Sequence, residues 1–193
     1  MIFRLAWLAA LLAAAAGAFA QSADELRRYL EDGRKVAAQF VRELGGELRR
    51  ELEATGPLRS IIVCKFSAPE VASSLSRMTG WRVSRVSLRA RNPALGQPDA
   101  WEQRVLVDFD RRAQGGEKPE AIEFAEVVTE PGGTFYRYMK ALPVDRLCLQ
   151  CHGPAESLSG SVKERLASDY PFDKATGYSL GQIRGAVTIK RPL

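Results

Sequence analysis

The hydrophobic pattern of the chain changes its period at Trp81, and this change constrains the fold more than any other feature. Before it, apolar residues recur every three or four positions, as on one face of a helix. From Trp81 to Ala90 the period is two, as along a strand with two different faces. Because helices collect early and hairpin-joined strands collect late, we predict an α+β domain with an antiparallel sheet.

The first predicted element is a long amphipathic helix. Ser22 and Glu25 make a capping-box pair at its start, and Gly56-Pro57 ends it. Acidic and basic residues alternate along it, which is typical of a solvated face with i,i+4 pairs. A homodimer through this N-terminal helix is the alternative, because some thirty residues is long for a helix in so small a domain.

The other elements are predicted from caps, turn residues and the period of apolar positions. Helices are expected over 57–64, 68–79 and 98–115, and strands over 81–90, 122–129, 134–141 and 185–190.

The first twenty residues are predicted to be a signal peptide. Arg4 precedes a Leu- and Ala-rich run, and Ala18-Phe19-Ala20 has the small-x-small pattern of a signal peptidase site. The apolar run is shorter than the roughly 20 residues that span a bilayer, and no later stretch is comparable, which excludes a polytopic membrane protein. We expect cleavage near Ala20/Gln21, a periplasmic protein with no stable membrane span after cleavage, and one domain over residues 21–193.

Composition excludes further classes. Hydrophobic residues make up 46% of the chain, enough for one core without disulfide staples, and three cysteines are no disulfide scaffold. The net charge is +5, but no basic tract is interleaved with aromatic residues, so we expect no nucleic-acid partner.

The pentapeptide Cys148-Leu149-Gln150-Cys151-His152 is the clearest chemical motif, because C-x-x-C-H is the c-type haem attachment pattern. Two thiols at this spacing can each add to one vinyl group of a haem, and the next imidazole can bind the iron. The motif predicts one covalent haem c held by Cys148 and Cys151, with His152 as an axial ligand.

Two other readings of this motif remain open. A redox-active dithiol would need a thioredoxin-like βαβ context, which the hairpin upstream does not provide. A zinc site would need four ligands, and Cys64 would have to join Cys148, Cys151 and His152, without the second paired half of a zinc ribbon or finger.

The second axial ligand cannot be histidine, because His152 is the single histidine of the chain. The candidates are Cys64, Met78, Met139, a lysine, an N-terminal amine or water. Cys64 is the thiol left over once two are attached to haem, although a free cysteine is more often a small buried hydrophobe.

A run of further motifs in a fixed order resembles a family of bacterial single-haem c-type domains, the Tll-like haem domain. The resemblance spans about Asp24 to Pro192. The matching segments are Val63-Cys64-Lys65, Ala68-Pro69-Glu70, Gly80-Trp81-Arg82-Val83, Arg91-Asn92-Pro93, Trp101-Glu102, Cys148 to Gly153, Tyr170-Pro171 with Asp173, and Gly177-Tyr178 with Gly181 and Gly185.

This resemblance implies a PAS-like α+β fold around the haem, and iron ligated by the motif histidine and a cysteine, which fall on His152 and Cys64. Members of the family are exported cytochromes and sensor modules. An anionic thiolate favours ferric iron, so a low reduction potential is expected.

Five arginines and no acid lie between Arg77 and Arg91. Arg85 and Arg89 fall on one face of the predicted strand, where their guanidinium groups could contact haem propionates. A solvated strand face, or a docking surface for an acidic redox partner, is the alternative.

Together these patterns predict an exported monohaem cytochrome that transfers single electrons to or from an unknown protein. The alternative function is a redox or gas (NO or CO) sensor that acts through a partner protein. An enzyme is not expected, since no distal histidine exists and six-coordinate iron leaves no open position.

Overall fold

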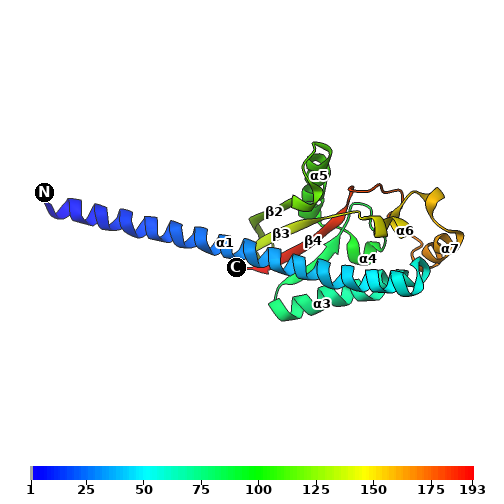
Figure 1. The fold of residues 1–193 in the computed structure, drawn as a ribbon. Coiled ribbons are helices and arrows are strands. Elements are labelled where there is room, and N and C mark those ends of the chain that lie inside the picture. Colours follow the sequence, from blue (N-terminus) through cyan, green and yellow to red (C-terminus); the bar gives the residue numbers. More distant parts are fainter. Residues whose placement is uncertain (1) are drawn as a thin grey trace.

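The computed structural model of the chain describes residues 2–193, with side chains from Ala23 onward (Figure 1). The helices are α1 (Ile2–Thr55), α2 (Pro57–Ile62), α3 (Ala68–Thr79), α4 (Pro93–Gly96), α5 (Ala100–Gln114), α6 (Leu149–His152) and α7 (Gly160–Asp169). The strands are β1 (Arg82–Val86), β2 (Glu123–Glu130), β3 (Gly133–Pro143) and β4 (Ile183–Pro192). From Ala23 onward, no helix of the chain is both long enough and apolar enough to cross a membrane.

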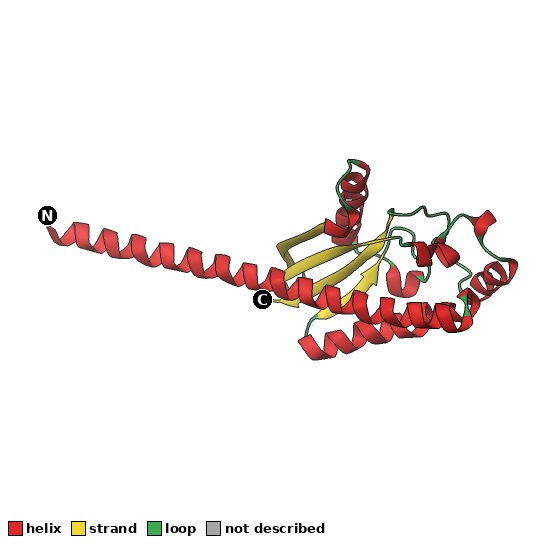
Figure 2. Ribbon diagram, in the orientation of Figure 1, coloured by secondary structure: helices red, strands yellow, loops and turns green. Residues whose placement is uncertain are grey.

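The strands form one antiparallel sheet in the order β1-β4-β3-β2. The last strand, β4, therefore lies in the middle and pairs with β1 on one side and β3 on the other (Figure 2). The predicted α+β class, the antiparallel sheet and the long N-terminal helix are confirmed.

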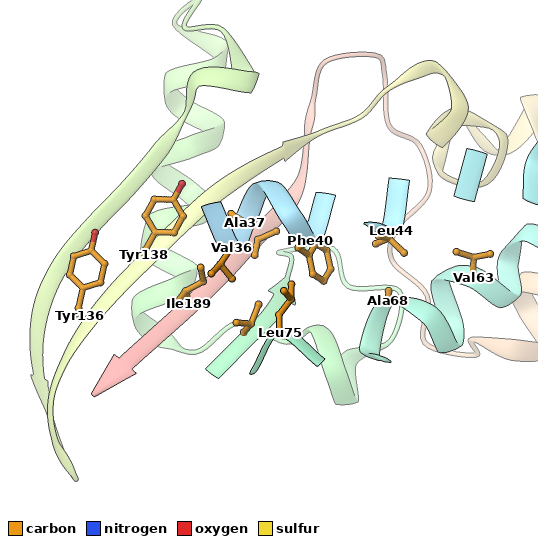
Figure 3. Close-up of a cluster of buried hydrophobic side chains, with 12 residues drawn as sticks. Val36, Ala37, Phe40, Leu44, Val63, Ala68, Leu75, Tyr136, Tyr138 and Ile189 are labelled. Carbon is orange, nitrogen blue, oxygen red and sulfur yellow. The ribbon is translucent and has the colours of Figure 1, made fainter. Parts of the chain in front are cut away.

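Helices cover both faces of the sheet. On one face, Tyr138, Val187 and Ile189 pack against α1 and α3, in the cluster drawn in Figure 3. On the other face, Met139 and Ala186 pack against α5. Because successive strand residues point to opposite faces, each strand contributes to both cores.

The first core depends on a close approach of α1 to the sheet. Phe40 and Ala37 of α1 are 1% exposed, and they lie in the same cluster as Tyr138 and Val187. Gly33 makes the approach possible, since a Cβ there would lie 3.1 Å from the ring of Tyr138. The apolar stripe seen in the sequence is thus the face that α1 buries.

The two short helices predicted after Pro57 are parts of one helical segment that runs from Pro57 to Thr79. A π turn, Val63–Ser67, joins α2 to α3, and the amide of Ala68 donates to the carbonyl of Val63. Pro69 has no amide hydrogen and its ring would clash with the carbonyl four residues earlier, so a wider turn relieves the conflict. The sequence predicts the breaks at proline but not the continuity.

Two predicted boundaries are wrong. The long helix begins at Ile2 rather than Ser22, because the Ala- and Leu-rich leader has high helix propensity and contains no proline. Met1 lies outside the described residues, and the signal peptide stays a prediction. The strand expected over 81–90 ends at Val86, because the hydroxyl of Ser87 accepts from the amide of Arg89 and turns the chain.

Candidate functional site

A cavity of about 910 Å³ opens between α1, the α2–α3 segment, the ends of β1 and β4, and the turn that carries the C-x-x-C-H motif. Cys64, Cys148, Cys151 and His152 all line it, although almost ninety residues separate the first from the last. Its volume lies in the range of cavities that bind small molecules and cofactors. The fold therefore brings the predicted ligands to one place.

The motif forms a compact helical turn. Cys148 ends a 3₁₀ turn (Arg146–Cys148) whose first amide is capped by Asp145, and Cys151 lies in α6. Residues three apart in a helical turn lie on the same side of it. The thiols of Cys148 and Cys151 therefore both face the cavity. Burial raises the pKa of Cys148, and it raises the pKa of Cys151 to about 11. Both groups are therefore neutral thiols near pH 7.

His152 is held from its Nδ1 side. Nδ1 lies 2.6 Å from the carbonyl oxygen of Ala175, a distance at which Nδ1–H donates to it. Arg184 Nε lies 3.2 Å from the same nitrogen, but a protonated Nδ1 cannot accept, so Arg184 is a neighbouring cation rather than a donor. This tautomer leaves the lone pair of Nε2 available for a metal.

The backbone around His152 is fixed as well. The amide of Tyr178 donates to the carbonyl of His152 at 2.9 Å, and the amide of Gly177 donates to the carbonyl of Gly153 at 2.7 Å. The Tyr178 ring meets the imidazole edge-on, with 6.3 Å between ring centroids. Burial, followed by the charges of Arg184 and Arg91, holds the pKa of His152 well below its ordinary value. The imidazole is neutral, which is the form that binds metals.

Cys64 lies in the π turn, is half-buried and lines the cavity. The methionine alternatives lie elsewhere: Met78 is 69% exposed at the end of α3, and Met139 is fully buried in the core under α5. Lys65 lines the cavity too, but its amine is bound to Asp169 at 3.1 Å. Of the sulfur candidates raised by the sequence, Cys64 is the one placed at the cavity.

The zinc alternative needs its ligands to converge. Within the described part of the chain, no group of three or more His, Cys, Asp or Glu side chains lies close enough together to hold a metal ion.

The arginines at the cavity differ from those expected. Arg85 lines it. Arg89 does not, because the chain leaves the sheet after Val86, and its guanidinium bonds the carbonyls of Lys174 and Thr176 and stacks on Tyr178. The shared strand face predicted for Arg85 and Arg89 does not exist. Arg184, which the sequence did not single out, lines the cavity in its place.

Arg184 is a half-buried cation without a counter-charge among the described residues. Its guanidinium donates to the Ser87 hydroxyl at 2.8 Å and to the carbonyl of Arg89 at 3.2 Å. Among the side chains described, no carboxylate lies within ion-pair distance of Arg184 or of Arg85. Burial, with the charge of Arg85 next, lowers the pKa of Arg184 to about 10. This arrangement favours an anionic ligand group beside the two arginines.

Arg91 connects the turn that carries the C-x-x-C-H motif to the segment around Asp173 and Ala175. Its Nε donates to Asp173 at 3.0 Å, and its Nη2 donates to the carbonyls of Cys151 at 2.5 Å and of Ala175 at 3.3 Å. The same Ala175 carbonyl accepts from His152. Arg91 is therefore a positioning residue for the motif. The sequence marked it as the last of the five arginines from Arg77 to Arg91 and by its place before Asn92-Pro93, but not as a contact of the motif.

Comparisons with known proteins place the chain among related sequences. A sequence model of the Tll0287-like family matches residues 9–192. Among solved structures, the chain is similar to one described as the crystal structure of the cyanobacterial heme-protein Tll0287, with 23% sequence identity and a TM-score of 0.60. The match covers 88% of this chain and 95% of that chain, and it indicates a shared fold. No curated protein matches the chain significantly.

Replacing Arg91 with Gln should lower the free energy of unfolding by about 3 kcal/mol, because the change leaves the Asp173 carboxylate half-buried and without its cation. Arg91→Lys should lower the free energy of unfolding by less, since lysine keeps the positive charge and loses only the multiple N–H donors of the guanidinium group. The measurement is urea unfolding. Arg77→Gln is the control, because Arg77 and its partner Glu70 are exposed. Equal losses in Arg91→Gln and Arg77→Gln would contradict a positioning role.

Proposed function

Because the chain belongs to the Tll0287-like family, we propose that it is a c-type haem protein that exchanges single electrons with a partner protein. The observation that carries this proposal is the cavity that joins Cys148, Cys151 and His152 on one wall to Cys64 on another. The similar cyanobacterial structure is described as that of a heme-protein, which agrees with the proposal.

The residues around the cavity fit the covalent haem. Cys148 and Cys151 would form the thioethers, and His152 would bind iron through Nε2, the nitrogen left free by the bond to Ala175. Cys64 would bind the other side of the iron from the π turn. Apolar side chains make up much of the remaining wall, as a porphyrin requires; among them are Leu44, Leu48, Leu52, Ile61, Ala72 and Leu142.

The propionate groups of the haem would meet cations. Arg85 and Arg184 line the cavity and have no carboxylate partner within the described residues, so two carboxylates entering with the haem would neutralise them. This role replaces the one predicted for Arg89, whose side chain is bound to carbonyls outside the cavity.

The chemistry that the haem supplies is one-electron transfer. A thiolate from Cys64 would stabilise ferric iron and so lower the reduction potential relative to a Met/His-ligated haem. With His152 and Cys64 both used as ligands, no position would stay open for a substrate. This occupancy favours a carrier over an enzyme.

Export is part of the proposal, because c-type thioethers form outside the cytoplasm. The Arg4 to Ala20 segment has the sequence of a signal peptide, and a periplasmic location follows from it.

A sensor is the second candidate, and the π turn is the observation that favours it. Cys64 lies in a turn that is one residue wider than an α-helical turn, and such turns are less stable than the regular helix on either side. Loss of the Cys64 bond would free this turn to relax, and α3 would move with it. A partner protein could read that movement.

The first test concerns covalent attachment. Protein matured with the c-type haem assembly machinery should gain the mass of one haem per chain. The double variant Cys148→Ser/Cys151→Ser should lose it, while Cys64→Ser should keep it, because only the motif thiols form thioethers. Mass spectrometry of the denatured protein measures this. Zinc without haem in that preparation would refute the proposal.

The second test concerns the Cys64 ligand. Cys64→Ala removes an anionic donor, so the midpoint potential should rise by at least about 60 mV, a tenfold change in the one-electron equilibrium. The reduced variant should also bind CO. Met78→Ala and Met139→Ala are the controls and should do neither, because neither methionine lines the cavity. An unchanged absorption spectrum in Cys64→Ala would assign the ligand elsewhere.

The third test concerns charge beside the haem. Arg184→Gln and Arg85→Gln should each lower the midpoint potential, by about 40 mV for each kcal/mol lost, since removing a cation favours the ferric state. Arg82→Gln, on the opposite face of β1 and outside the cavity, is the control. Potentiometric titration followed by absorbance measures the shift. Shifts no larger than the control's would place the propionates away from these arginines.

A further inference from the structure

Three arginines of α1 stand along one side of the cavity opening. Arg42, Arg49 and Arg50 line the cavity and are exposed to solvent. None of them makes an ion pair with any side chain that the structure describes, although α1 also carries acidic residues. We call Arg42, Gly45, Gly46, Arg49 and Arg50 the α1 rim.

The charges around the cavity do not balance. Among the side chains from Ala23 onward, Asp145 is the one carboxylate that lines it, against seven arginine and lysine side chains. Lys65 and Arg91 pair with aspartates behind the wall, at 3.1 and 3.0 Å. Arg85 and Arg184 would be neutralised by two propionates. The three arginines of the α1 rim are then left over, and their side chains are exposed to solvent at the cavity.

The backbone of the rim is open to close approach. Gly45 and Gly46 stand side by side in the middle of α1, where each costs roughly 1 kcal/mol relative to alanine. A Cβ on Gly45 would meet no atom within 4 Å, and a Cβ on Gly46 would meet only the guanidinium of Arg50. Both glycines line the cavity, and no neighbouring element of the described structure packs against either of them. They leave a shallow strip of bare helix flanked by cations.

We propose that the α1 rim is the docking surface for an acidic redox protein, which exchanges one electron with the haem through this opening. The inference rests on the proposed function and adds the partner's chemistry and the place where it binds. Positive charge that gathers at one opening steers an anionic protein to that opening and raises the rate of productive encounter. The electron balance is simple: the haem iron gains or loses one electron, the partner loses or gains it, and no bond is formed.

An anionic membrane is a different occupant, and the position of the rim argues against it. The three arginines border the opening of the cofactor cavity, so a bilayer seated there would cover the route that a redox partner needs. An acidic protein uses both features of the rim, because its carboxylates can pair with the arginines while a narrow loop lies over the glycines.

The test compares two triple variants with the same loss of charge. Arg42→Gln/Arg49→Gln/Arg50→Gln removes the rim cations, whereas Arg27→Gln/Arg104→Gln/Arg111→Gln removes three exposed arginines that lie outside the cavity. An acidic flavodoxin serves as the probe partner, and isothermal titration calorimetry gives its affinity. The rim variant should bind it roughly tenfold more weakly at low ionic strength, and the control variant should bind like the wild type.

Stopped-flow oxidation of the reduced haem provides the second readout. Each ferrous iron gives one electron to hexacyanoferrate(III), an anion, or to tris(phenanthroline)cobalt(III), a cation. Removing the rim charges should slow the first reaction severalfold and accelerate the second, and added salt should reduce both effects. The control variant should change neither rate.

Two results would overturn the proposal. Equal effects in both triple variants would show that net charge acts without a specific surface. Loss of binding to phosphatidylglycerol vesicles in the rim variant, with flavodoxin affinity unchanged, would assign the rim to a membrane. A matured protein without haem would instead refute the proposed function, and the flavodoxin affinities would still test the rim.

Discussion

The packing of α1 against the sheet determines where the site can form. Phe40 and Ala37 lose almost all their exposure against Tyr138 and Val187, and truncating a buried phenylalanine of this kind costs about 3–5 kcal/mol. The same helix continues past the sheet, and its next turns, at Leu48 and Leu52, become a wall of the cavity. The contacts that stabilise the domain thus also fix the position of that wall. The α2–α3 segment runs back alongside α1 (Figure 1). This return places Cys64 at the cavity.

Patterns of local chemistry could be predicted from the sequence, whereas contacts between distant segments could not. The start of α5 after Pro98-Asp99, the apolar stripe of α5 and the hairpin all lie where apolar periods and turn residues predict them. Cys148, Cys151 and His152 could be singled out from the sequence because the C-x-x-C-H spacing suits haem attachment, and all three line the cavity. The placement of Cys64 at the cavity agrees with the family resemblance, while its π turn depends on how Pro69 is accommodated in a continuing helix.

The arginines show what the two-residue period of a strand cannot predict by itself. Arg85 and Arg89 share a face only if the strand continues, and one hydroxyl bond from Ser87 is enough to end that pattern. Arg184 lies ninety-nine positions after Arg85 and reaches the same cavity because β4 pairs with β1, a pairing that no local signal encodes. Arg85 and Arg184 are half-buried and unpaired among the described residues, and partial burial of a cation without a partner is costly. The two arginines identify the part of the cavity that suits an anionic ligand group. A sequence motif could not identify it.

The π turn also has a consequence for how this helix can change during evolution. A π turn holds one more residue than the α-helical turn it replaces. Deleting one residue between Ile62 and Cys64 would rotate everything before the deletion by about 100° relative to α3, since an α-helix has 3.6 residues per turn. Either α2 would lose its packing contacts with α1, or Cys64 would point away from the cavity. Chains of this kind can therefore tolerate substitutions in the turn at positions other than Cys64 far more easily than a change in its length.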